Sequence, residues 1–189
     1  EVVEIPSSRI KREIARIFEE IALLLELKGE SPFKSKAYLN AARTIETLTE
    51  DVTEMVASGR VRDLKGVGQA LAEKLAQLVG TGRLAYYEEL KRSVPSGLLE
   101  MTAIAGMGPK KISAVWEKLG ITTVGELEYA CIENRLVGLP GFGEKTQEKI
   151  KQGILQLKKR RGYHLFANVI GEARAIIEAA GLAPGVRRA

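Results

Sequence analysis

The phrase Leu64-Lys65-Gly66-Val67-Gly68 decides the fold of this chain, because the 189-residue sequence repeats its pattern twice more. The other two copies read Ile104-Ala105-Gly106-Met107-Gly108 and Leu139-Pro140-Gly141-Phe142-Gly143. We call these segments the first, second and third hairpins. Their first glycines are 40 residues apart (Gly66 to Gly106) and then 35 residues apart (Gly106 to Gly141). This recurrence is an internal repeat, and it predicts that one small structural unit is built three times.

Glycine at both positions has a physical reason. A tight turn between two helices needs backbone angles that only glycine adopts at little cost. The missing side chains also leave backbone N–H groups bare at the start of the next helix, where the helix dipole is positive. A phosphate can bind there. A single copy is explained as well by an ordinary helix–helix turn. Three copies, each followed by a helix-forming run with lysine, favour phosphate binding, and we expect Val67, Met107 and Phe142 to point into the core.

The remaining sequence predicts an all-α protein. Apolar residues from Ile10 to Leu25 recur at three- and four-residue steps, which is typical of one face of a long helix. No segment alternates as a strand does. The expected helices are 8–28, one that begins at Ser31-Pro32, 50–58, 69–79, 84–94, 109–119, 123–134, the basic helix after the third hairpin, and 163–180. Thr49 is the expected N-cap of 50–58, and Thr123 with Glu126 forms a capping box for 123–134. Gly80 and Gly120 are the expected ends of 69–79 and 109–119, and Pro95-Ser96-Gly97 interrupts the helix 84–94.

Composition narrows the function. The net charge is +5, and residues 144–161 alone hold seven basic and two acidic side chains, which suits a polyanionic partner. No run of 18 apolar residues predicts a membrane span. One cysteine, Cys131, excludes an internal disulfide, and one histidine makes zinc an unsuitable cofactor. The two aspartates, Asp51 and Asp63, are not clustered, so we expect no two-metal nucleotidyl transfer from these residues.

The order of these parts resembles the N-terminal half of the bacterial family X DNA polymerases, the family of eukaryotic DNA polymerase beta. The resemblance covers nearly the whole chain. The matching segments are 22–30, Pro32-Phe33-Lys34, Ala37-Tyr38, 40–43, Gly66-Val67-Gly68, 72–75, Thr81-Gly82-Arg83-Leu84, 86–90, Val94-Pro95, 106–111 and 139–146.

The resemblance implies three parts. Residues 1–80 would form a four-helix domain of the 8 kDa lyase type, closed by the first helix-hairpin-helix. Residues 81–160 would form the fingers (or thumb) subdomain with two further helix-hairpin-helix motifs, and 161–189 a helix leading to the palm. The chain stops about where that palm would begin, so the catalytic carboxylates and their magnesium would lie outside it. The parent protein would be a DNA-directed DNA polymerase, a nucleotidyltransferase.

The resemblance also assigns roles to residues. Lys74 matches the amine that attacks the aldehyde of an abasic sugar; the alternative is a solvated helix lysine. Lys34, Tyr38 and Arg62 match the lining of a pocket for a 5′-phosphate, and Phe33 falls where a ring can stack on a base. The further DNA-binding residues would be Gly66, Gly68, Gly106, Gly108, Lys110, Lys111, Gly141, Gly143 and Lys145.

In this family the hairpins also bind a sodium or potassium ion through backbone carbonyls. By position these are Leu64 and Val67 in the first hairpin, and Thr102, Ile104 and Met107 at the second. The expected function is sequence-independent binding of gapped or nicked DNA at 5′-phosphate ends, in repair, by a cytoplasmic, nucleoid-associated monomer. The alternatives are a 5′-deoxyribose phosphate lyase acting through Lys74 and a stand-alone helix-hairpin-helix protein.

Overall fold

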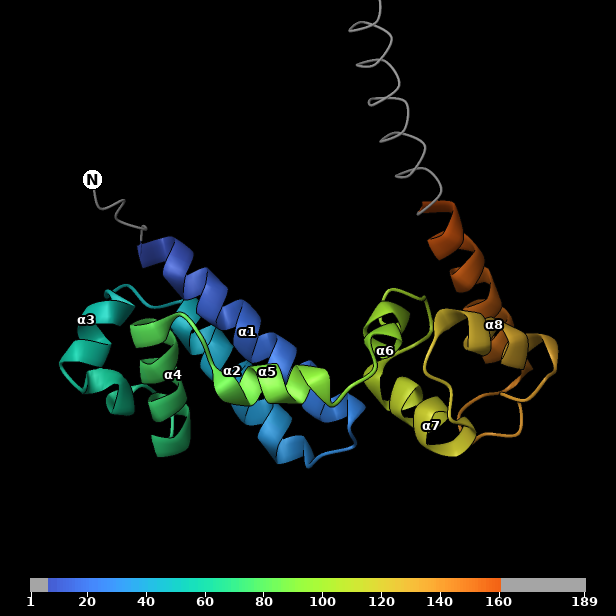
Figure 1. The fold of residues 1–189 in the computed structure, drawn as a ribbon, viewed down its shortest axis with the longest axis horizontal. Coiled ribbons are helices and arrows are strands. Elements are labelled where there is room, and N and C mark those ends of the chain that lie inside the picture. Colours follow the sequence, from blue (N-terminus) through green and yellow to red (C-terminus); the bar gives the residue numbers. More distant parts are fainter. Residues whose placement is uncertain (1–6, 161–189) are drawn as a thin grey trace, which may run out of the picture. The chain divides into compact units, whose positions relative to one another are not determined.

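The computed structural model describes residues 7–160, and all regular structure within them is helical, as the sequence predicts. The helix expected at 163–180 lies outside the described residues. The elements, labelled in Figure 1, are α1 (Ser7–Leu27), α2 (Pro32–Glu46), α3 (Val52–Ala57), the 3₁₀ helix η1 (Arg60–Asp63), α4 (Gln69–Thr81), α5 (Ala85–Arg92), α6 (Ser96–Met101), α7 (Pro109–Leu119) and α8 (Val124–Ile132). A further helix occupies residues 144–160.

The described residues divide into two compact units. One holds residues 7–102 and 108–123, and the other holds 103–107 and 124–160. The boundaries expected after residues 80 and 160 stay predictions. No helix within the described residues is both long and apolar enough to cross a bilayer.

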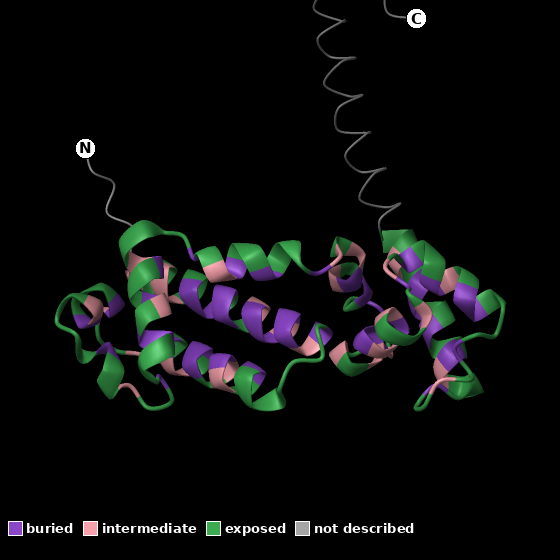
Figure 2. Cartoon of the chain, turned by 60° about the horizontal axis from the view of Figure 1, so that its bottom comes forward, coloured by how far each residue is buried: buried purple, intermediate pink, exposed green. Residues whose placement is uncertain are grey.

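Helix α1 is the centre of the first unit, because α2, α3, α4, α5 and α7 all pack against it (Figure 1). Its apolar face is buried, with Phe18, Ile21 and Leu24 fully enclosed. Figure 2 shows the buried residues as stripes along the central helices, with exposed residues on their outer sides. Two residues after the end of α1 lies Gly29, whose φ of +68° allows the N–H of Glu30 to reach the carbonyl of Leu25 at 3.0 Å.

Several helix boundaries differ from the sequence-based expectation. Asp51, not Thr49, caps α3, because its carboxylate accepts the N–H groups of Thr53 (2.7 Å) and Glu54 (3.3 Å). Helix α4 continues past Gly80 and ends at Gly82, which has a φ of +67°.

Helix α6 is not among the helices that the sequence predicts. Pro95 does not merely interrupt a helix: it occupies the N-cap of a new one, Ser96–Met101. Gly97 in its first turn lies so close to Thr122 that a Cβ there would come within 2.2 Å of the Thr122 carbonyl oxygen. Gly97 is therefore needed where two segments approach each other closely, and it does not interrupt a helix.

The second unit is built on α8 and the helix 144–160. Leu127, Leu136, Phe142 and Ile150 are fully enclosed in its core. Two residues after the end of α8 lies Asn134, the one non-glycine residue with positive φ (+57°) among the described residues. Asn134 N–H bonds the Cys131 carbonyl, and Arg135 N–H bonds that of Ala130 at 2.9 Å, the pattern of a Schellman cap.

Candidate nucleic-acid interface

The three hairpins have the same backbone geometry. The first glycine of each lies in the left-handed region, with φ of +83° at Gly66, +94° at Gly106 and +82° at Gly141. Each turn is closed by one hydrogen bond of 3.0 Å, donated by Val67 to Leu64, by Met107 to Ile104 and by Phe142 to Leu139. A positive φ at the third of four turn residues is the arrangement that requires glycine. The sequence repeat is therefore a structural repeat.

The residue between the glycines ties each turn to the core, as the sequence predicts. Val67, Met107 and Phe142 are 4%, 4% and 1% exposed. The second glycine is exposed in every copy. Gly68 and Gly108 are the N-caps of α4 and α7, and neither helix start has a side-chain cap. The first amides of these helices therefore have no side-chain cap, and they lie next to an exposed glycine at the positive end of a helix dipole.

Helix α2 fixes the position of the first hairpin. The hydroxyl of Thr44 donates a hydrogen bond to the carbonyl of Lys65 at 3.1 Å. One turn earlier, Asn40 lies against the turn, and a Cβ on Gly66 would be 3.8 Å from its Cβ. Because α2 also carries Lys34 and Tyr38, the helix holds these residues and the hairpin in one fixed arrangement.

Three of the predicted site residues, Lys34, Tyr38 and Lys74, interact with Tyr86, a residue that the sequence did not single out as functional. The ammonium of Lys74, on α4, lies 5.0 Å from the centroid of the Tyr86 ring, on α5. The Tyr38 ring stacks on Tyr86 at 6.3 Å between centroids, and its other neighbour is Phe18, edge-on at 5.4 Å. Burial, followed by the nearby Tyr86 hydroxyl, raises the pKa of the Tyr38 phenol. Tyr86 also contributes to the raised pKa of Lys34, after Glu30.

Lys34 forms an ion pair with Glu30. Its ammonium lies 2.9 Å from Glu30 Oε2, one helical turn earlier in the chain. The hydrogen bond and charge of Glu30 raise the pKa of the Lys34 ammonium, which is therefore a permanent cation at neutral pH. The neighbouring Phe33 is 83% exposed, the most exposed of the large apolar side chains in the described residues. Packing in the core therefore does not account for the phenyl ring at this position.

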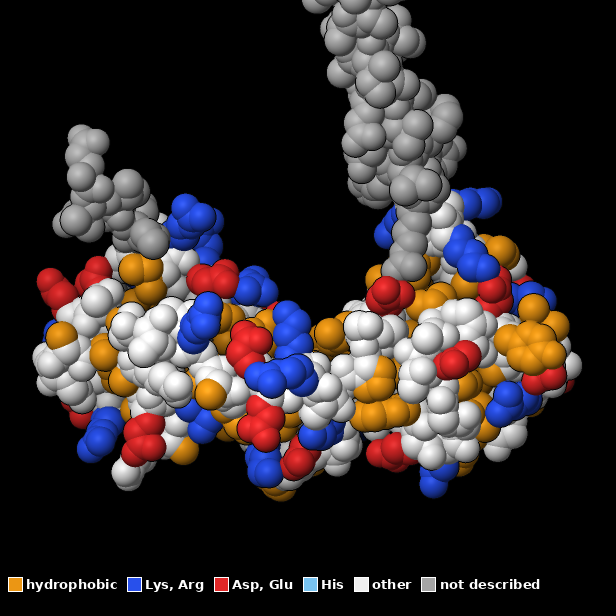
Figure 3. Space-filling model, viewed as in Figure 1, with side chains coloured by type: hydrophobic (Ala, Val, Ile, Leu, Met, Phe, Trp, Pro, Cys, Tyr) orange, Lys and Arg blue, Asp and Glu red, His pale blue; other side chains and the backbone are white. Residues whose placement is uncertain are grey.

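The other predicted contact residues are at the surface. Arg62, in η1, is exposed, and so are Lys110 and Lys145, near the starts of the helices that follow the second and third hairpins; Lys111 is half-buried. Figure 3 shows Lys and Arg interleaved with Asp and Glu over the visible face of α1, α2 and α5, so that face has no broad basic surface. In the basic segment 144–161, Lys158 pairs with Glu128 of α8, and Arg161 lies outside the described residues.

The carbonyls expected to hold a monovalent cation have suitable chemistry. Leu64 and Ile104 each accept one backbone N–H in the closing bond of their turns, which leaves a second lone pair on each oxygen. Backbone carbonyl oxygens are the ligands that alkali ions use in proteins. Residues 7–160 contain no group of three His, Cys, Asp or Glu side chains that could hold a metal ion.

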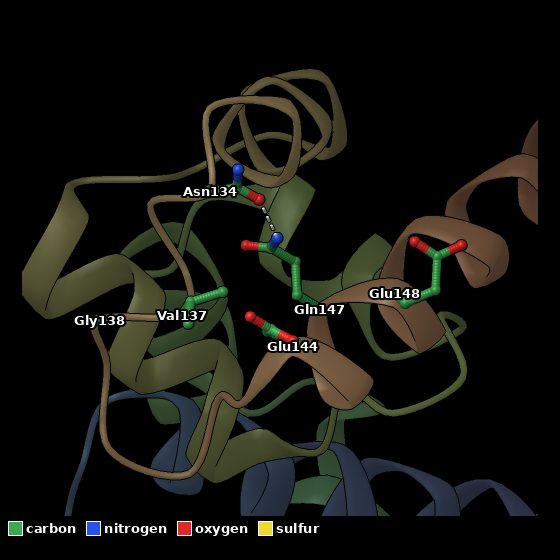
Figure 4. A pocket seen from close by; sticks show the side chains of 6 residues that line it. All are labelled: Asn134, Val137, Gly138, Glu144, Gln147 and Glu148. Carbon is green, nitrogen blue, oxygen red and sulfur yellow. Dashed lines mark hydrogen bonds between the residues drawn. The ribbon is translucent and has the colours of Figure 1, made fainter.

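A pocket of about 610 Å³ lies beside the third hairpin (Figure 4). Gln147 donates a hydrogen bond to the Asn134 side chain at 2.7 Å across it. The carboxylates of Glu144 and Glu148 line the same space. These acids make the pocket unsuitable for a phosphate, so any phosphate contact of the third hairpin belongs to the exposed turn and not to this pocket.

The comparisons with known proteins agree with this geometry. Residues 10–84 match the model of a "Helix-hairpin-helix domain", and residues 98–154 match a "SAM-like Helix-hairpin-helix tandem". The chain is 33% identical over 150 residues to the "DNA polymerase/3'-5' exonuclease PolX" of Bacillus subtilis (strain 168). That alignment covers 79% of this chain and 26% of the relative, so the chain spans about a quarter of the relative's length. Along most of its length the chain is therefore homologous to a family X DNA polymerase, in a region built of helix-hairpin-helix domains.

Proposed function

We propose that the three hairpins bind gapped DNA independently of the DNA sequence. In this proposal the first hairpin holds the 5′-phosphate end, and the second and third hairpins hold the neighbouring duplex backbone. The observation that carries the proposal is the shared geometry of the three turns, each with an exposed second glycine next to a helix start. Backbone N–H groups and lysines read phosphates and not base edges, so they cannot distinguish sequences.

The 5′-phosphate assignment has separate support. Lys34, Tyr38 and Lys74 share the surroundings of Tyr86, and α2 ties that cluster to the first hairpin through Thr44. Two cations near one tyrosine suit a terminal phosphate, which carries more charge than a bridging one. A sodium or potassium ion on the carbonyls of Leu64 and Val67, and on those of Thr102, Ile104 and Met107, would add positive charge at the two hairpins.

The wider setting follows from the homology. The relative's name describes a DNA polymerase with exonuclease activity. We propose that this chain supplies DNA binding to a polymerase of that type, acting in gap-filling repair as a monomer in the bacterial cytoplasm.

Binding of labelled duplexes tests the proposal directly. A one-nucleotide gap with a 5′-phosphate, the same gap with a 5′-hydroxyl, and a second gap of unrelated sequence are titrated over a range of salt concentrations. We expect equal affinity for the two sequences, preference for the 5′-phosphate, and a steep loss of affinity with salt, because bound cations release counterions from DNA. A log–log salt slope near zero would overturn the proposal.

Variants separate the end site from the rest of the surface. Lys34→Met and Lys74→Met should each reduce the preference for the 5′-phosphate while leaving general duplex binding in place. Lys36→Met is the matched control, because Lys36 is an exposed lysine on the same helix as Lys34.

Lyase activity is the second candidate, because Lys74 is half-buried on the Tyr86 ring and makes no ion pair with a carboxylate within residues 7–160. Its unprotonated amine would add to C1′ of an abasic sugar, and water would leave to give an imine. Borohydride should trap that imine as a covalent adduct. Lys74→Ala should abolish the trapping and Lys36→Ala should not; trapping that survives Lys74→Ala removes Lys74 from the role.

A further inference from the structure

The second hairpin is in contact with a helix that belongs to the third hairpin. Gly153, in the helix 144–160, lies against the turn so closely that a Cβ there would be 2.8 Å from Ile104 Cγ2 and 3.0 Å from the Ala105 nitrogen. One helical turn earlier, Lys149 covers Gly106. Residues four apart share one face of a helix, so this face of the helix 144–160 is the one that supports the second hairpin.

The stem of Lys149 occupies the space that a side chain at Gly106 would take. A Cβ built on Gly106 would be 3.4 Å from Lys149 Cδ and 3.5 Å from Cγ. The methylenes are thus packed on the turn, while the residue as a whole remains exposed. A lysine whose stem lies on a surface carries its ammonium at the edge of that surface, in solvent. Here the edge is that of a turn proposed to bind phosphate.

No acid on its own helix neutralises Lys149. The positions three and four residues away are Lys145, Thr146, Gln152 and Gly153, none of which carries a carboxylate. Lys149 forms no ion pair within the described part of the chain, unlike Lys158, which pairs with Glu128. Its charge therefore remains available to an anion at the second hairpin.

We propose that Lys149 is a phosphate-binding residue of the second hairpin, supplied by the helix of the third hairpin. Lys145 and Lys149 then form a row on one helix face, with Lys145 beside the third hairpin and Lys149 beside the second. The row joins the two turns into one continuous site for a DNA backbone. This inference rests on the proposed function and adds a contact residue that the sequence motifs do not indicate.

The test compares Lys149→Met with Lys151→Met. Methionine keeps a stem of similar length over Gly106 and removes the charge. Lys151 is exposed on the same helix, but its charge acts on Cys131, on the side facing α8, so its loss changes the net charge equally at another place. Affinity is measured for several unlabelled duplexes of different sequence, which compete with one labelled duplex over a range of salt concentrations. Circular dichroism checks that each variant is folded.

We expect Lys149→Met to weaken binding equally for all sequences and to lower the magnitude of the log–log salt slope by about one. Lys149→Arg should restore the slope, and Lys151→Met should leave it at the wild-type value. Equal effects of Lys149→Met and Lys151→Met, or a wild-type slope in Lys149→Met, would overturn this inference alone. A slope near zero in the wild-type protein would instead overturn the proposed function, and this inference with it.

Discussion

The ammonium of Lys74 lies 5.0 Å from the centroid of the Tyr86 ring, so a lysine of α4 rests on an aromatic side chain of α5. Tyr86 also stacks on Tyr38 of α2, with an angle of 9° between the rings. One tyrosine thereby connects three helices around the proposed 5′-phosphate site. The aromatic face orients the lysine, and the lysine supplies the charge.

Replacing Tyr86 should therefore act through Lys74. Tyr86→Leu removes the ring and leaves the Lys74 side chain without a fixed position, whereas Tyr86→Phe keeps the ring face. A cation–π contact at an exposed site contributes about 0.5–1 kcal/mol, so we expect Tyr86→Leu to reduce the preference for a 5′-phosphate over a 5′-hydroxyl by about two- to fivefold. Tyr86→Phe should remain close to wild type. Equal preference in both variants and the wild type would contradict this role.

Glu30 competes with phosphate for Lys34, since its carboxylate lies 2.9 Å from the ammonium. Glu30→Gln removes the competing charge, and it also removes a repulsive charge near the incoming DNA. Exposed ion pairs of this kind are weak because water and salt screen them, so the gain in affinity for the 5′-phosphate should be no more than about fivefold. Glu46→Gln, at the exposed far end of the same helix as Lys34, serves as the control in the same titration.

Helix capping gives a stability prediction. Asp51→Ala should lower Tm by a few degrees, because the N–H groups of Thr53 and Glu54 lose their acceptor. Thr49→Ala should leave Tm almost unchanged. The nearby Ser7 side chain and then the Thr53 amide lower the pKa of Asp51, so the contribution of this carboxylate to stability is complete above the ordinary carboxylate pKa and is lost as the pH falls through the lowered value. Thermal melts at pH 7 and pH 3 should therefore differ less for Asp51→Ala than for wild type.

These residues also show what the sequence could and could not predict. The three turns, their buried middle residues and the helix from Pro109 to Gly120 follow from local rules, because glycine and proline act on their own backbone. Thr49 and Asp51 are both good N-caps, and only the packing of α3 decides between them. Tyr86 has no local signal at all. Its importance comes from the meeting of α2, α4 and α5, and the distance between those helices cannot be derived from residue types.

Burial of Cys131 gives a prediction about reactivity. Desolvation raises the pKa of this thiol from 9.0 to about 11. At pH 8 the folded protein should hold about 100-fold less thiolate than an exposed cysteine, since each pH unit is a factor of ten. Alkylation by iodoacetamide should therefore be slow in buffer and fast in 8 M urea. Rapid alkylation of the folded protein would contradict the burial.

The same thiol affects stability at high pH. Well below pH 9 the thiol is protonated in both states and adds no pH dependence. Between pH 9 and 11 the unfolded chain loses this proton first, so stability falls as the pH rises. The fall in Tm from pH 8 to pH 10.5 should be smaller in Cys131→Ala than in the wild type.

Two helical glycines of the second unit should respond oppositely to alanine. At Gly125, in α8, a Cβ would meet nothing within 4 Å, so Gly125→Ala should stabilise the protein by about 0.5–1 kcal/mol through backbone entropy. At Gly153 the new methyl would be 2.8 Å from Ile104 Cγ2 and 3.0 Å from the Ala105 nitrogen. The backbone atom cannot move without shifting the second hairpin, so Gly153→Ala should cost about 1–3 kcal/mol.

Urea titrations measure the free energy of unfolding of the two variants, which should rise in Gly125→Ala and fall in Gly153→Ala. Because Gly153→Ala pushes the second hairpin away from the helix 144–160, it should also separate Lys149 from Gly106 and weaken DNA binding under conditions where the protein is fully folded. Gly125→Ala changes no contact of the turn and should bind DNA as the wild type does. If Gly153→Ala were as stable as Gly125→Ala, the close packing of the second hairpin on that helix would be wrong, and the shared site built on it would lose its support.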